Sequence, residues 1–212
     1  MSDKFNVLDY TAGPLLKSGQ LTDYTPAGRT TKDDGGFQRG IVGSKVAAQY
    51  EILTTGQYSG STNITVNGKT DVHSNACVFD KVTSLMWSRT YSASVYGSGT
   101  QDLFWSQAGV NGEDIFNYCD AANTAAMAGF TDWRIPNIVE LYSTLQFQMG
   151  SANPNTTAFP VFIPVIIFSS TTNPADTTAA LAVGTNGGII TSFSKTSTRR
   201  VVWLCRLGVY SG

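Results

Sequence analysis

Apolar residues recur at helical spacing in the segment from residue 102 to residue 130. This period of about 3.6 residues predicts an amphipathic α-helix. Asn111 is placed to cap its N-terminus, and Gly129 is suited to end it. The acidic residues Glu113 and Asp114 lie in the first turn, where the helix dipole favours negative charge. The apolar positions are Ile115, Tyr118, Cys119, Ala122, Ala125 and Ala126.

A second, shorter helix is predicted to begin after Pro136. Asn137 and Glu140 have the three-residue spacing of a capping box, with Asn in place of the usual Ser or Thr. Leu141 and Leu145 then continue the apolar face of this helix.

Short strand-like runs surround the two helices. The run "ACVFDKVTSLMW" (76–87) predicts a strand, a polar turn and a second strand that ends in Trp87. We expect Trp87 and Trp203 in the core. Two helices within many short strands predict an α+β domain. Four further strands are predicted near the end of the chain, in "VIIFSS", "AALAVG", "GGIITSFS" and "RRVVWLCRLG", with "TNGG" (185–188) as a hairpin turn.

The first 70 residues show little periodicity. Pro, Gly and Asp-Asp-Gly-Gly turn signals separate short strand-like pieces, of which "NITV" followed by "NG" predicts a strand and a tight turn. We interpret residues 1–70 as an extended β-rich arm used in assembly, with a mobile tail as the alternative. Residues 71–212 are then the folded domain.

Composition narrows the classes of function. Charged residues make up 14% of the 212 residues, against about 25% in an average soluble protein, and Gly, Ser, Thr and Asn are abundant instead. This balance is typical of a loop-rich β protein and of one that packs into an assembly. The net charge is −1, and Arg199 with Arg200 is only a pair, so we expect no nucleic-acid partner.

The sequence offers no clear membrane or export segment. The apolar stretch 158–170 is interrupted by Pro160 and Pro164, so we expect a core segment and no membrane insertion. The opening residues "MSDKFNVLDY" lack the basic and apolar regions of a secretion signal, so we expect synthesis without export.

Enzyme chemistry finds little support in the sequence. His73, the single histidine, falls in "KTDVHSN", which we interpret as a polar turn, and no nucleophile motif accompanies it. The cysteines are Cys77, Cys119 and Cys205, and their spacing fits no zinc site. One disulfide plus one thiol, and three free thiols, are both compatible with the sequence.

The segment "GFTDWRIPNIVEL" (129–141) holds the most distinctive group of candidate functional residues. Asp132, Trp133 and Arg134 are either a functional pair around a Trp or a corner of the fold, with Pro136 setting the start of the next helix. Neighbouring residues of an extended segment point in opposite directions, which favours the corner. There, Asp132 and Arg134 would bond to nearby backbone or to each other.

Asn-Pro turns give a weaker hypothesis of a calcium site. Asn153 with Asn155, and Asn173 with Asp176, carry the oxygen atoms that calcium prefers, but in no known loop pattern. Turn formation explains them better, so we expect no cofactor.

Five segments, in this order, resemble the Lcl C-terminal-domain-like family, which is named from a bacterial collagen-like adhesin: "VFDKVTSLMW", "FWSQA…YCDAAN", "GFTDWRIPNIVEL", "FSST" and "VVWLCRLG". The resemblance covers about residues 70–208. It implies a C-type-lectin-like fold, with two helices around short antiparallel sheets and a long variable loop region. It also implies a disulfide between Cys119 and Cys205, leaving Cys77 as a core thiol.

The sequence departs from the family pattern at four positions. Ser84 stands where the family usually has Gly, Ile135 replaces Leu, Phe168 replaces Trp, and Leu204 separates Trp203 from the cysteine. The apolar and aromatic exchanges preserve burial. The related formylglycine-generating enzymes need two close C-terminal cysteines, and a lone Cys205 does not support that activity.

These observations together predict a non-enzymatic bacteriophage virion protein: a tail fibre, tail tip or head decoration that displays a C-type-lectin-like binding domain. Its expected partners are other virion subunits, further copies of itself, and a glycan or protein receptor on the host surface. The alternative is a secreted or surface adhesin of a bacterium, located at the cell surface. In either case we expect the ligand to contact the loops of residues 146–200.

Overall fold

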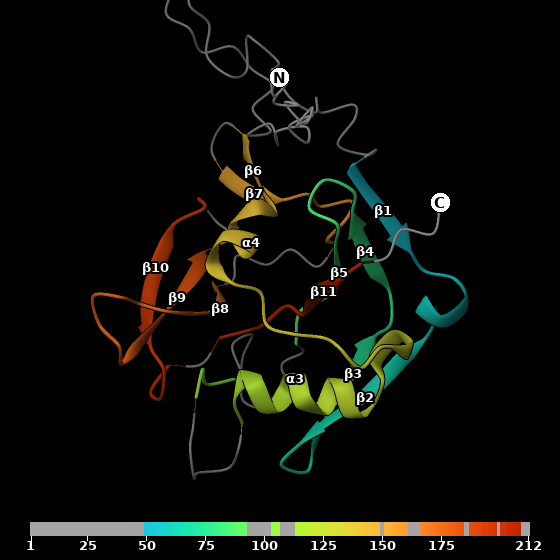
Figure 1. The fold of residues 1–212 in the computed structure, drawn as a ribbon, viewed down its shortest axis with the longest axis horizontal. Coiled ribbons are helices and arrows are strands. Elements are labelled where there is room, and N and C mark those ends of the chain that lie inside the picture. The colour runs from blue at the N-terminus through green and yellow to red at the C-terminus, as the bar shows by residue number, and fades with distance from the viewer. Residues whose placement is uncertain are drawn as a thin grey trace, which may run out of the picture.

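The computed structural model describes residues 49–92, 103–106, 113–148, 151–160, 166–184, 187–198 and 200–208. It has the predicted α+β architecture, with helices among short antiparallel strands (Figure 1). No helix in these ranges is long and apolar enough to span a membrane. The elements are β1 (Tyr50–Leu53), η1 (Gly56–Tyr58), β2 (Ser61–Val66), β3 (Lys69–Ser74), β4 (Cys77–Asp80), β5 (Leu85–Ser88), α3 (Ile115–Thr124), η2 (Met127–Gly129), α4 (Ile138–Ser143), β6 (Leu145–Gln148), β7 (Ser151–Pro154), β8 (Ile166–Thr172), β9 (Ala179–Gly184), β10 (Ile190–Ser194) and β11 (Cys205–Leu207).

The central sheet has the strand order β1-β4-β5-β11, and all its pairings are antiparallel. Strands β4 and β5 are the two strands that the run 76–87 predicted, and both are fully buried. Alternate residues face opposite sides: Phe79 and Met86 join one core cluster, whereas Val78 and Trp87 join the other. The sheet is therefore covered on both faces, which explains its continuous apolar sequence.

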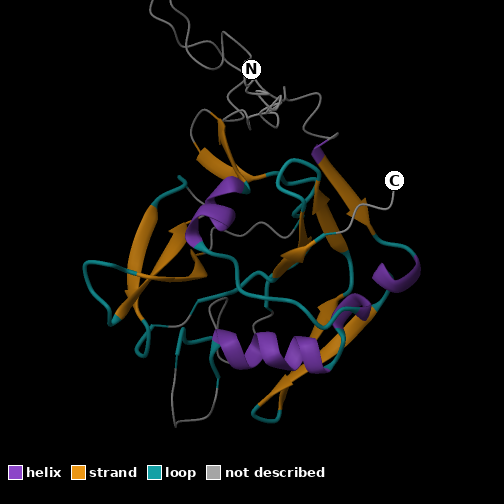
Figure 2. Ribbon diagram, in the orientation of Figure 1, coloured by secondary structure: helices purple, strands orange, loops and turns teal. Residues whose placement is uncertain are grey.

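A second sheet, with the order β10-β9-β8, lies on the opposite side of the molecule (Figures 1 and 2). Its strands correspond to three of the four predicted near the end of the chain. In the predicted "TNGG" turn, Gly187 and Gly188 have φ values of 95° and 63°, which glycine adopts without strain. Among the described residues of the fourth predicted strand, only the three of β11 form a strand.

The hairpin β2–β3 confirms the strand and tight turn predicted around "NITVNG". Asn67 and Gly68 have φ values of 51° and 73°, as a two-residue hairpin turn requires. The hairpin packs beside α3, and β1 pairs with β4 in the central sheet. Residues 50–66 therefore belong to the folded body, and the boundary expected after residue 70 is not a structural one. The rest of the predicted arm, residues 1–48, lies outside the described residues.

Both predicted helices are present, but the start of α3 and the ends of both helices differ from the prediction. The cap of α3 is Asp114, whose side chain accepts hydrogen bonds from the backbone of residues 116 and 117, while Asn111 lies outside the described residues. Gly129 ends η2, which follows α3. Helix α4 has the predicted capping box of Asn137 and Glu140. It ends at Ser143, so Leu145 begins β6 instead of extending the helix.

Candidate functional site

Trp133 anchors the corner that the sequence singled out. Its side chain is 3% exposed, and its indole N–H donates to the carbonyl oxygen of Met127 at 2.9 Å. The side chain of Asn123 clamps the Trp133 backbone, accepting from its N–H at 2.7 Å and donating to its carbonyl oxygen at 2.8 Å. The corner is therefore tied to the end of α3.

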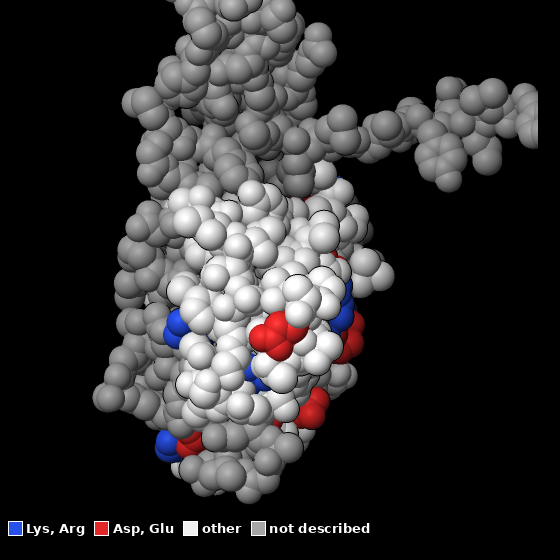
Figure 3. Space-filling view, turned by 90° about the vertical axis from the view of Figure 1, so that its left-hand side faces the viewer, with Lys and Arg blue, Asp and Glu red and all other residues white. Residues whose placement is uncertain are grey.

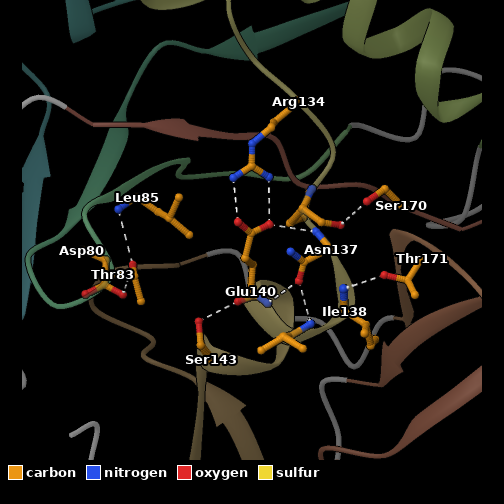
Figure 4. Close-up of polar contacts among 12 residues, drawn as sticks. Asp80, Thr83, Leu85, Arg134, Asn137, Ile138, Glu140, Ser143, Ser170 and Thr171 are labelled. Carbon is orange, nitrogen blue, oxygen red and sulfur yellow. Dashed lines mark hydrogen bonds and ion pairs between the residues drawn. The ribbon is translucent and has the colours of Figure 1, made fainter.

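Asp132 and Arg134 point to different partners, so the expectation that they might bond to each other was wrong. Asp132 accepts two hydrogen bonds from Arg206, at 2.6 and 3.1 Å. Arg134 forms a two-bond ion pair with Glu140, at 2.8 and 2.6 Å, which Figure 4 shows. The guanidinium groups hold the pKa of both carboxyls below the usual range. Both carboxylates are therefore engaged by guanidinium groups.

The backbone of the corner connects separate strands. Arg134 exchanges two backbone hydrogen bonds with Cys205, at 2.8 and 2.9 Å, and the carbonyl oxygen of Pro136 accepts from the backbone N–H of Ser170 at 2.8 Å. The corner thus joins the final strand β11 to strand β8. This arrangement supports an architectural role for the segment.

The disulfide implied by the resemblance is not formed in the structure. Cys77, Cys119 and Cys205 are free, buried thiols. The Cys119 thiol donates to the carbonyl oxygen of Trp133 at 3.1 Å instead. Burial raises the pKa of each of the three thiols to about 12. The alternative of three thiols, left open by the residues themselves, is the arrangement observed.

Trp87 and Trp203 lie in the core, as expected, 0% and 2% exposed, with their rings edge to face.

His73 lies in β3 and is buried, so its assignment to a polar turn was wrong. Its Nδ1 is 2.9 Å from the hydroxyl of Tyr118 and 3.3 Å from a carboxylate oxygen of Asp71. The Tyr118 hydroxyl donates to the same Asp71 oxygen at 2.5 Å, and Thr90 contacts the other ring nitrogen at 3.2 Å. This buried polar cluster joins the hairpin β2–β3 to α3.

The sequence of strand β3 does not indicate that it contributes to a buried cluster. Val72 is 66% exposed, whereas its neighbours Asp71 and His73 are buried. The usual alternation is therefore reversed, with polar side chains inside and the apolar one outside. The sequence feature that could have predicted this cluster is the hydroxyl of Tyr118 on the apolar face of a helix. A buried hydroxyl needs a hydrogen-bond partner from another element.

The oxygen atoms considered for calcium are used in turns. The side-chain oxygen of Asn155 accepts from the backbone N–H groups of residues 157 and 158, and that of Asn173 accepts from residue 175. Asp176 accepts from the backbone and the hydroxyl of Thr178, and these bonds lower its pKa. Nothing is described of the Asn153 side chain. Within the described ranges, no three His, Cys, Asp or Glu residues gather as metal ligands.

A partly exposed aromatic surface lies where β8 and β10 end, and we call it the Trp105 surface. Its centre is Trp105, whose indole N–H donates to the carbonyl oxygen of Ser169 at 2.7 Å. The ring meets that of Phe116 edge to face, with centroids 4.9 Å apart. The ammonium of Lys195 lies 4.2 Å from the Trp105 ring centroid and donates to the Thr172 hydroxyl at 2.8 Å. The members are Trp105, Phe116, Thr172, Asp176 and Lys195.

The surroundings of the Trp105 surface are polar but carry few charges. The turn 173–178 is exposed around Asp176, and the adjacent strand ends are rich in Ser and Thr. Figure 3 turns this side of the molecule to the viewer and shows mostly uncharged described surface, with scattered acidic and basic groups. Such a surface suits adaptable hydrogen bonds around a fixed aromatic ring. The sequence reasoning placed the ligand in residues 146–200 and missed Trp105, which joins this region only through tertiary contacts.

The fold and this surface define a small α+β domain in which short antiparallel sheets and two helices present polar loops. The model of the Lcl C-terminal domain family matches residues 76–206, more than half of the chain. The protein therefore belongs to the Lcl C-terminal domain family, as its sequence motifs predicted. No curated protein and no solved structure matches the chain.

Proposed function

We propose that the protein is a non-enzymatic adhesion protein whose C-type-lectin-like domain binds a glycan or protein receptor on a host surface. The Trp105 surface carries this proposal, because it combines an aromatic ring that is held by contacts with Ser169 and Lys195 with polar side chains and little charge. The ring supplies apolar contact at low entropic cost, and Thr172 and Asp176 supply hydrogen-bonding groups.

Four carboxylates of the described residues serve the fold, which favours binding over catalysis at their positions. Asp114 and Glu140 cap helices, Asp132 pairs with Arg206, and Asp80 accepts from the backbone N–H of Val82. A catalytic carboxylate needs a free oxygen directed towards a substrate.

The binding proposal is tested with cells of the host bacterium and the fluorescently labelled full chain. We expect Trp105→Ala to weaken cell binding by at least tenfold and Trp105→Phe to retain part of it. Val72→Thr is a matched control, because it changes an exposed apolar side chain on the distant strand β3. Circular dichroism establishes that each variant is folded. Equal binding by folded Trp105→Ala and the wild-type chain would refute a role for this surface.

We further propose that the protein is a component of a bacteriophage virion, in a tail fibre, tail tip or head decoration. The low charge supports this setting, since few charges must be desolvated when subunits pack together. The alternative is a bacterial secreted or surface adhesin. Mass spectrometry of density-purified virions distinguishes the two settings, with stoichiometric amounts of this chain expected in the particles. Recovery only from the bacterial surface or secreted fraction would establish the alternative.

A further inference from the structure

The two edges of the sheet β10-β9-β8 differ in how they are covered. At the β8 edge, Phe168 donates its backbone N–H to the carbonyl oxygen of Val201 at 3.1 Å, and Ser170 donates to that of Pro136 at 2.8 Å. The β8–β9 register is also irregular between Phe168 and Thr172. Neighbouring chain segments and a distorted register therefore protect this edge.

Strand β10 forms the other edge, and among the described residues it pairs only with β9. Two hydrogen bonds show which residue pairs of this ladder are hydrogen-bonded: Gly184 N–H to Ile189 O at 2.9 Å, and Lys195 N–H to Thr178 O at 3.0 Å. Hydrogen-bonded pairs alternate along an antiparallel ladder, so every second residue of β10 directs its backbone groups away from β9. These residues are Ile190, Ser192 and Ser194.

The β10 edge lacks the usual features that discourage strand pairing. Its five residues include no Pro and no charged side chain, and their register with β9 is continuous from Ile190 to Ser194. Lys195 follows directly, but its ammonium is held by Thr172 and the Trp105 ring. Ile190 remains 46% exposed, and no described helix or strand lies beyond β10 in Figure 1.

We propose that β10 pairs antiparallel with β10 of a second copy of this chain, which joins two three-stranded sheets into one six-stranded sheet. The strand is its own complement. A two-fold axis at Ser192 places Ser192 opposite its own copy and Ile190 opposite Ser194, so each outward N–H meets an outward carbonyl oxygen.

The distribution of charge and apolar surface fits this symmetric pairing. The same axis places Lys195 of each copy opposite Ile189 of the other, so the two lysines lie at opposite ends of the interface. No like charges face each other, and the exposed side chains of Ile189 and Ile190 lose contact with water. A five-residue ladder gives a small interface, so the pairing is weak and depends on concentration.

Charge exchange at the two-fold axis tests the proposed register. In sedimentation equilibrium of the full chain, the wild type and the control Ser192→Thr are expected to dimerise as concentration rises. Ser192→Lys and Ser192→Glu each place like charges opposite each other, and we expect at least a tenfold rise in the dimer dissociation constant. An equal mixture of the two variants should restore dimerisation, because opposite charges then meet. A monomeric wild type, unaffected variants, or a mixture that stays monomeric would overturn the proposal.

Amide hydrogen exchange identifies what covers the edge. We expect the amides of Ile190, Ser192 and Ser194 to gain protection as the protein concentration rises. Protection that does not vary with concentration means that a segment of the same chain covers β10, and it overturns the proposal. Absence of protection at every concentration also overturns it.

Discussion

At the scale of single residues, Ser84 shows how one departure from the family pattern stores strain. It has a φ of 57°, in the left-handed region, where the family usually has Gly. A non-glycine residue in this region costs about 1–2 kcal/mol. We expect Ser84→Gly to raise the free energy of unfolding by up to about 1 kcal/mol after the entropy cost of glycine. Urea denaturation measures it. Ser84→Ala keeps the Cβ atom and should change little, so equal stabilisation by both variants would contradict the strain argument.

The Glu140 carboxylate is the second case at this scale, because it caps α4 and pairs with Arg134. Glu140→Gln retains a side chain able to cap but loses the charge, so we expect a loss of about 0.5–1 kcal/mol at pH 7 for this partly exposed pair. Arg134 lowers the folded-state pKa of Glu140. The stabilisation is therefore present above the unfolded pKa of about 4.3 and disappears as pH falls through the folded pKa.

Urea denaturation at pH 7 and at pH 2–3 tests this dependence. The wild type and Glu140→Gln should differ at pH 7 and converge at low pH. Glu51→Gln is the matched control, because its pair with Lys81 is longer, at 3.5 Å, and more exposed. A difference that persists unchanged at low pH would exclude the ion pair as its source.

At the scale of elements, the buried polar cluster holds the hairpin β2–β3 against α3. Tyr118→Phe removes the hydroxyl shared by Asp71 and His73 and leaves buried polar groups with fewer partners. We expect a loss of about 1–3 kcal/mol in the free energy of unfolding. Tyr58→Phe is the control, because the partly buried Tyr58 side chain forms no hydrogen bond within the described part of the chain. Thermal and urea unfolding measure both variants, and an unaffected Tyr118→Phe would show that the cluster adds no net stability.

How well the elements were predicted depended on how local their causes are. The capping box of α4 and the Asn67–Gly68 turn follow from neighbouring residues, and both were found from the sequence. The reversed polarity of β3 depends on Tyr118, 45 residues beyond His73, and no local pattern shows it. The N-cap of α3 is likewise Asp114 and not the predicted Asn111. The backbone of Asp114 is still extended, so the helix begins only after it.

At the scale of the whole molecule, the family and the α+β architecture were predicted because several motifs kept their order along the chain. The candidate site was only half predicted. Residues 146–200 supply Thr172, Asp176 and Lys195, but the central Trp105 reaches them from another part of the chain through contacts with Ser169 and Lys195. A surface assembled from distant segments depends on packing, which periodicity and turn signals do not encode.

The three cysteines report on whether the molecule opens as one unit. Cys77 and Cys119 belong to one core cluster and Cys205 to the other. With burial and a thiol pKa of about 12, each should react with iodoacetamide at pH 8 only when its surroundings open. If the two clusters unfold cooperatively, all three thiols will be labelled at the same slow rate, measured by mass spectrometry of peptides, and at once in urea without reductant. Unequal rates would show that the clusters open separately. Failure of Cys119 and Cys205 to react in urea would instead establish a disulfide between them.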